Sequence, residues 1–193
     1  DSVPDGTAYL RFRTRTTTDV SDYDTFVANI TCTITQRPTY NVTNIVPTAE
    51  SGNSTAPFDG VGYRNNAYIS SSSNAESSYN GFVLTGFIPI TVTTASAPTI
   101  YVRGVTIDTA NSYTRLSIYD SNKQHKATHN STGIAQYYIT EELGDQYYKL
   151  TPAYAASTGN TRLSSYGTGT LYVRFSFTGV GENLVMTLGQ PIN

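Results

Sequence analysis

The sequence predicts an all-β protein, a jelly-roll β-sandwich preceded by a β-hairpin that is a fragment of a similar module. Thr, Ser and Asn together occupy 64 of the 193 positions, and Thr favours strands because its branched Cβ packs well on a pleated surface. Charged residues make up 13% of the chain, about half the usual share, so the side chains that normally cover helices are scarce. Short runs of alternating hydrophobic and polar residues recur about every ten to fifteen residues, as in a sandwich.

The beginning of the chain resembles its end. The run Tyr9-Leu10-Arg11-Phe12 is nearly repeated as Tyr172-Val173-Arg174-Phe175, and a Gly-Thr pair precedes each run. In the first copy, alternating hydrophobic and arginine side chains predict a half-buried strand, and its partner strand ends before Pro38 because proline has no N–H to donate. We therefore predict that residues 1–37 are the terminal hairpin of a preceding module, and that residues 38–193 form the sandwich.

Glycine, serine and proline define the next elements. Gly60 and Gly62 precede Tyr63 and Arg64, and these glycines predict a sharp turn in a loop that presents the two side chains. The polar run 70–78 is typical of a loop. The run 82–90 is apolar on both faces and predicts a central strand that ends at Pro89.

The second half of the chain predicts further strands and one helical turn. The run 114–119 has Leu116 and Ile118 on the inner face of a strand, with Arg115, Ser117 and Tyr119 on its outer face. Residues of the kind that form tight turns follow it. The remaining predicted elements are strands at 100–107, 137–139 and 146–150, a helical turn at 141–143, a tight turn at 120–123, and a hairpin with strands at 171–177 and 184–188.

Several of these segments, in this order, resemble a recurring domain of tailed-bacteriophage tail, baseplate and fibre proteins. The resemblance covers most of residues 44–190 and implies a galactose-binding-like jelly roll, of the carbohydrate-binding-module type, on a virion appendage. Members of that family differ in whether they bind sugar or only build the appendage, so the resemblance leaves both functions open. The segments that carry it are 59–64, 81–90, 100–105, 115–123 and 172–176.

Charge and hydropathy argue against two classes of partner. The net charge is −2 and the pI is about 5.6, so the sequence lacks the basic footprint of a nucleic-acid-binding protein. It also contains no apolar run of the roughly twenty residues that a membrane span needs. We expect neither nucleic-acid binding nor membrane insertion.

The two histidines do not predict a metal site or a catalytic base. His125 and His129 are four residues apart, a spacing that would place two metal ligands on one face of a helix. However, polar turn-forming residues follow them at 130–133, and we therefore expect a solvated loop.

The acidic residues do not predict a glycosidase or a calcium loop. Glycosidases usually need a pair of carboxylates around the scissile bond. Glu141 and Glu142 are adjacent, so in an extended segment they point to opposite faces. Asp22 and Asp24 lack the glycine and the distal glutamate of a dedicated calcium loop. We expect no enzymatic activity, no cofactor and no bound metal.

Tyrosine is the residue type that suggests a binding site. The chain has 16 Tyr and no Trp, and sugar sites combine an aromatic face with Arg, Asn or Asp side chains that bond to hydroxyl groups. The alternative is that the tyrosines pack at sheet edges or between subunits, while the arginines pair with carboxylates. The predicted ligand-binding residues are Tyr63, Arg64, Asn66, Tyr113, Arg115 and Tyr154.

The expected function is that of a non-enzymatic virion appendage domain, in a tail fibre or baseplate, that displays loops to a glycan of the host surface. Its expected partners are other virion subunits, including further copies of itself, and a cell-surface glycan. The alternative is a purely structural virion protein, a fibre-shaft or capsid-decoration domain whose aromatic faces are subunit contacts. An enzyme such as a tail depolymerase ranks third, because it would need the acid pair that the sequence lacks.

Overall fold

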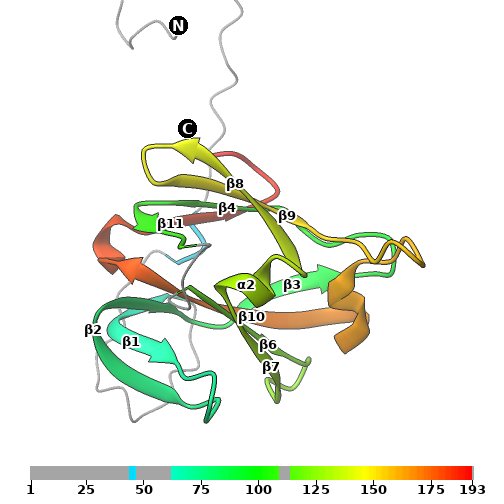
Figure 1. Cartoon of the computed structure of the whole chain (residues 1–193), viewed down its shortest axis with the longest axis horizontal. Helices are drawn as coiled ribbons and strands as arrows, with labels where there is room; N and C mark the ends of the chain where they lie inside the picture. The colour runs from blue at the N-terminus through cyan, green and yellow to red at the C-terminus, as the bar shows by residue number, and fades with distance from the viewer. Residues whose placement is uncertain (1–43, 47–61, 109–113, 193) are drawn as a thin grey trace, which may run out of the picture. The chain divides into compact units, whose positions relative to one another are not determined.

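The computed structural model describes residues 44–46, 62–108 and 114–192. The chain divides into two units, Asp1–Pro38 and Thr39–Asn193. The first unit lies outside the described residues, so the hairpin at 1–37 and its origin in a preceding module stay predictions. The described part of the second unit consists of two antiparallel sheets packed face to face (Figure 1), which confirms the predicted all-β sandwich. Jelly-roll connectivity stays a prediction.

The larger sheet is centred on β10, the longest described strand. Strands β2 and β3 pair with one edge of β10, and β6 and β5 pair with the other. The strands of this sheet are β1 (Tyr63–Ile69), β2 (Glu76–Thr85), β10 (Gly169–Gly179), β6 (Arg115–Tyr119) and β7 (His125–Asn130) in spatial order, with β3 (Ile88–Val92) and β5 (Val105–Thr106) also paired to β10.

The smaller sheet lies across the core from β10. In spatial order its strands are β11 (Val185–Leu188), β4 (Ile100–Arg103), β9 (Tyr147–Pro152) and β8 (Tyr138–Gly144). The hairpin predicted from strands 171–177 and 184–188 is wrong, because β10 and β11 lie in different sheets. Short helices connect the strands: α2 (Ser131–Ile134), η1 (Arg162–Tyr166) and η2 (Gly181–Asn183). None of the helices in the described ranges is long and apolar enough to cross a bilayer.

The core lies between the two sheets and includes every second side chain of β10. Leu171, Val173, Phe175 and Phe177 are all buried, as the alternating pattern predicts. The rings of Phe175 and Phe177 stack with their centroids 5.4 Å apart, and Tyr138 from the smaller sheet lies 6.3 Å from Phe175. Burial of large apolar side chains from both sheets is therefore what holds the sandwich together.

Gly104 divides the strand predicted at 100–107 between the two sheets. Residues before it form β4 of the smaller sheet, and residues after it form β5 of the larger one. The backbone of Gly104 has φ +86°, and a Cβ at this position would lie 1.7 Å from the carbonyl oxygen of Asn183. Only glycine allows this turn together with so close an approach.

Two predicted loop and strand boundaries are wrong. Strand β2 begins at Glu76, inside the polar run predicted as a loop, because Glu76 pairs with Ile69 across the β1–β2 hairpin. The run predicted to end at Pro89 instead breaks after Thr85 and continues as β3, where Pro89 lies opposite Tyr172. β3 pairs only with β10 among the described strands, and such an edge tolerates a residue that lacks an N–H.

Pairing with a neighbouring strand also overrides two local predictions. The helical turn predicted at 141–143 is wrong, because these residues lie in β8, where Glu141 faces Lys149 of β9. His125 and His129 lie in β7, which pairs with β6, and not in a loop. The tight turn at 120–123 is confirmed, since Asp120 Oδ1 accepts hydrogen bonds from the backbone N–H of Asn122 and Gln124, both at 2.9 Å.

The outer face of β6 is covered, contrary to the prediction. Ser117 and Tyr119 are buried. The ring of Phe87 lies 4.8 Å from that of Tyr119, and the guanidinium of Arg174 lies 4.9 Å above Phe87.

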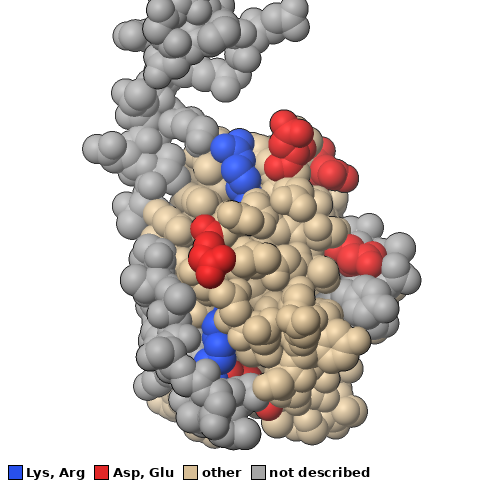
Figure 2. Space-filling view, turned by 90° about the vertical axis from the view of Figure 1, so that its left-hand side faces the viewer, with Lys and Arg blue, Asp and Glu red and all other residues tan. Residues whose placement is uncertain are grey.

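The part of the surface seen in Figure 2 carries few charged side chains, scattered over uncharged residues.

Candidate functional site

Tyr63 and Arg64 are internal residues, so the prediction of a loop that presents them is wrong. Both lie in β1, where Tyr63 faces Thr85 of β2, and the side chain of Arg64 is only 4% exposed. Arg64 forms an ion pair with Glu76. The ring of Tyr63 lies against Gly181, where an added Cβ would be 2.1 Å from the ring. Neither side chain is available to a ligand at the surface.

Asn66 and Arg115 also have structural contacts. Asn66 forms the bulge in β1, with φ +56°, and its side-chain oxygen accepts a hydrogen bond of 3.3 Å from the N–H of Gly81. Arg115 donates to the carbonyl of Ile69 at 2.6 Å, and its guanidinium lies 4.5 Å from the centre of the Tyr68 ring. Tyr113, its predicted partner, lies outside the described residues.

Tyr154 is the predicted site residue that remains on the surface beside a cavity. Its side chain is 47% exposed, and its hydroxyl donates to the carbonyl of Ala95 at 3.2 Å. Its backbone forms a β-bridge with Thr161. The structure does not bring the five described candidates together into one site, because Tyr63 and Arg64 are buried and Tyr154 lies at the surface.

The cavity beside Tyr154, which we call the Arg162 hollow, has a volume of about 370 Å³. It is formed by three separate segments of the chain: the loop after β3, the residue before β8, and the turn after β9 that continues into η1. Its lining residues are Thr94, Tyr137, Ala155, Thr158, Asn160, Thr161, Arg162, Ser164 and Ser165.

Backbone hydrogen bonds fix the wall formed by the turn. The N–H of Ala155 donates to the carbonyl of Asn160, and the N–H of Gly159 donates to that of Ala155, both at 2.8 Å. Thr161 then joins the turn to the loop after β3, because its N–H donates to Thr94 O at 2.7 Å and its hydroxyl donates to Thr93 O at 2.8 Å. The turn is thereby held at both ends.

Tyr137 forms the aromatic wall, and two neighbours hold it in place. Its ring lies 4.4 Å from the imidazole of His129, and its hydroxyl is 2.8 Å from that of Tyr166, which in turn lies 3.0 Å from His129 Nε2. Burial, with a smaller contribution from His125, lowers the pKa of His129. Burial also raises the pKa of Tyr166. Both groups are therefore uncharged at neutral pH, and the wall is a neutral hydrogen-bonded cluster.

Two nitrogen-bearing side chains of the hollow are available to a ligand. Among the described residues, the exposed guanidinium of Arg162 and the carboxamide of Asn160 form no hydrogen bond or ion pair with the protein. Both groups carry N–H donors. The described ranges contain no group of three or more His, Cys, Asp or Glu residues that could hold a metal ion. The hollow therefore offers hydrogen bonding and an aromatic surface.

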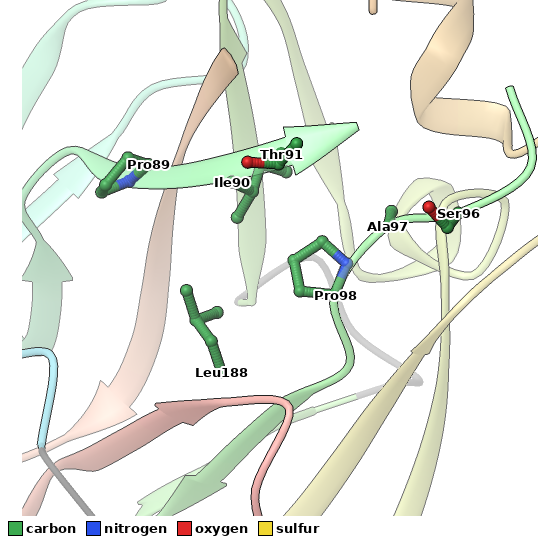
Figure 3. A pocket seen from close by; sticks show the side chains of 7 residues that line it. All are labelled: Pro89, Ile90, Thr91, Ser96, Ala97, Pro98 and Leu188. Atoms are coloured by element: carbon green, nitrogen blue, oxygen red, sulfur yellow. The ribbon is translucent and has the colours of Figure 1, made fainter. Parts of the chain in front are cut away.

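A second cavity, of about 440 Å³, lies between β3 and the end of β11. Figure 3 shows that Pro98 and Leu188 face each other across it, below Pro89 and Ile90 of β3. Its lining contains two hydroxyl groups, from Thr91 and Ser96, and neither an aromatic ring nor a charged side chain. Because it has few groups that could orient a ligand, it is the weaker candidate.

Sequence reasoning missed Tyr137, Asn160 and Arg162. The available signal was the turn-forming run 157–160, which is followed by Thr161 and then by Arg162. That run does not indicate Tyr137, which lies directly before β8 and lines the hollow from another part of the chain. The chain matches no protein-family model, no curated protein and no solved structure.

Proposed function

We propose that this chain is a non-enzymatic module of a virion appendage, a tail fibre or baseplate, and that it recognises a glycan of the host surface through the Arg162 hollow. The observation that carries the proposal is the combination, in one cavity, of an immobilised tyrosine ring with the uncommitted guanidinium and carboxamide of Arg162 and Asn160. The assignment to a virion rests on the resemblance to phage tail, baseplate and fibre domains.

The chemistry of the hollow suits a sugar. Tyrosine packs against the C–H faces of a pyranose, while Arg and Asn donate to its hydroxyl oxygens. The volume of about 370 Å³ lies in the range of small-molecule sites, and it would hold one or two sugar units. The affinity of one such open site is low, so recognition depends on several copies of the module in one appendage.

Binding of the full chain to a glycan array tests the proposal. We expect wild-type protein to bind at least one class of glycan, and Arg162→Ala and Asn160→Ala each to reduce that binding at least about tenfold. Both side chains lie at the surface, so the variants should melt like wild type. Lys126→Ala is the matched control, because it removes an exposed cation outside the hollow. Absence of any binding by wild-type protein, or full binding by both variants, would reject this site.

One observation favours the structural alternative, in which the chain contacts other subunits. Tyr68, Tyr79 and Phe82 form an aromatic cluster on the β1–β2 hairpin, with ring centroids 5.4–6.2 Å apart, and Tyr79 is 60% exposed. Exposed aromatic clusters are typical of subunit interfaces. If this cluster is a contact between copies, wild-type protein will sediment as an oligomer and Tyr79→Ser will shift it toward monomer. A wild-type monomer at all concentrations would exclude self-association.

A further inference from the structure

The Arg162 hollow carries one positive charge and no negative charge. Of its nine lining residues, Arg162 is the only one that is charged at neutral pH, and none is Asp or Glu. The carboxylates in the ion pairs of the described residues lie elsewhere, because Glu76 pairs with Arg64 and Arg174, Asp120 with Lys126, and Glu141 with Lys149. The positive charge of the hollow is therefore not neutralised by the described protein.

The hydroxyl groups around Arg162 have already donated their protons to the backbone. Thr161 donates to Thr93 O at 2.8 Å, Ser164 donates to Thr161 O at 2.6 Å, and Ser165 donates to Arg162 O at 2.8 Å. What these groups still offer is oxygen lone pairs, which accept hydrogen bonds. They suit the O–H donors of a sugar and do not suit an anion.

The nitrogen donors of the hollow's side chains are those of Arg162 and Asn160, beside the hydroxyl groups of Thr94 and Thr158. A guanidinium binds a planar carboxylate through two parallel hydrogen bonds, and it binds sulfate and phosphate oxygens in the same way. An anion placed there meets N–H groups, while hydroxyls on the same sugar unit meet the acceptor oxygens of Ser164 and Ser165. The hollow thus supplies a cation and N–H donors for an acidic group, and oxygen acceptors for sugar hydroxyls.

Resting on the proposed function, we infer that the glycan recognised by the hollow is anionic, with its acidic group bound by the guanidinium of Arg162 and the amide of Asn160. The hydroxyl groups of the same unit donate to the serine oxygens, and its ring packs toward Tyr137. Because Arg162 is exposed, the attraction is screened by salt, and the affinity for the acidic glycan falls as ionic strength rises.

The test measures binding of the full chain to three probes: oligosaccharides of galacturonic acid, the same oligosaccharides after reduction of their carboxyl groups, and a sulfated oligosaccharide. We expect wild-type protein to bind an acidic probe about 10- to 100-fold more tightly than the neutral one, the range for a charge-assisted hydrogen bond.

Arg162→Gln should remove this preference and leave the weak binding of the neutral probe. Arg162→Lys should retain part of it, and Lys126→Gln should retain all of it. The galacturonate and sulfated probes distinguish carboxylate from sulfate as the anion.

The outcomes separate this inference from the proposed function. Equal binding of acidic and neutral probes, with equal losses in Arg162→Gln, would overturn the acidic preference and keep the hollow as a sugar site. An acidic preference that survives in Arg162→Gln would place the anion elsewhere and overturn the assignment. Absence of binding to these probes and to every glycan of an array would overturn both proposals. A thermal melt of each variant, expected to match wild type, excludes loss of folding as the cause.

Discussion

Glu76 joins two arginines inside the sandwich. Its carboxylate pairs with Arg64 and lies 3.2 Å from Arg174 Nη2, and the three side chains are only 3–7% exposed. Arg174 also donates from Nε to Thr85 O at 2.9 Å. Ion pairs with so little access to water are costly to break, because the remaining charges stay buried without their counter-charge. Arg64, one of the two arginines predicted to bind a sugar, is therefore a structural residue.

We expect Glu76→Gln to lower the free energy of unfolding by about 3 kcal/mol, since two buried guanidinium groups lose their shared carboxylate. Chemical denaturation measures the change. The control is Glu141→Gln, which breaks an exposed pair with Lys149 and should cost no more than about 0.5 kcal/mol. Equal losses of stability in the two variants would show that the buried Glu76 cluster contributes no more than an exposed ion pair.

The histidines of β7 predict how stability depends on pH. Burial lowers the pKa of both His125 and His129 in the folded protein. The folded state thus binds protons less readily than the unfolded chain, whose histidines titrate near 6.5. The contribution of the two histidines to stability is fully present above that value and is lost as the pH falls from it through the lower pKa of the folded state. The urea midpoint should therefore be lower at pH 5.5 than at pH 7.5, and His129→Gln should reduce the difference. A urea midpoint that is unchanged or higher at pH 5.5 would contradict the predicted loss of stability at low pH.

At the scale of the elements, two glycines adopt a positive φ that favours glycine. Gly104 and Gly81 have nearly the same φ, +86° and +83°. A Cβ at Gly104 would meet the backbone of Asn183, whereas a Cβ at Gly81 would meet nothing within 4 Å. Gly104 lies where the chain leaves the smaller sheet for the larger one, so the requirement for glycine there has both a conformational and a steric cause.

Alanine substitutions at Gly81 and Gly104 separate the conformational cause from the steric cause. Gly81→Ala should cost about 1–2 kcal/mol, the conformational penalty of a positive φ for a residue with a Cβ. Gly104→Ala has the same penalty and in addition forces the β4–β5 crossing away from η2, so it should cost at least about 3 kcal/mol. Equilibrium unfolding of both variants measures the difference. Similar losses of stability in the two variants would mean that η2 shifts at little cost to make room for the added Cβ.

On the scale of the whole molecule, the two sheets depend on one shared core. Phe175 is fully buried, stacks on Phe177 of the same strand and lies near Tyr138 of the opposite sheet. Because side chains from both sheets fill one space, the sandwich is expected to unfold as a unit.

Phe175→Ala should lower the free energy of unfolding by about 3–5 kcal/mol, through lost burial and the cavity that remains. The transition in denaturant should stay single, with an unchanged slope. The matched control in the same strand is Thr170→Ala, an exposed position that should change stability by no more than about 0.5 kcal/mol. A loss of only a few tenths for Phe175→Ala would mean that the core relaxes around the gap.

Composition and strand periodicity determined by themselves that the chain is an all-β sandwich, that β10 buries Leu171 to Phe177 in alternation, and that a tight turn follows β6. These features depend on residues close in sequence, where side-chain direction and turn geometry are local properties. Tertiary structure alone decided which polar residues are exposed. Arg64 meets Glu76 and Arg174 only through the pairing of β1, β2 and β10, and the Arg162 hollow forms only where three separate parts of the chain meet. The partners of such residues lie 12 to 98 positions away, so no local pattern contains them.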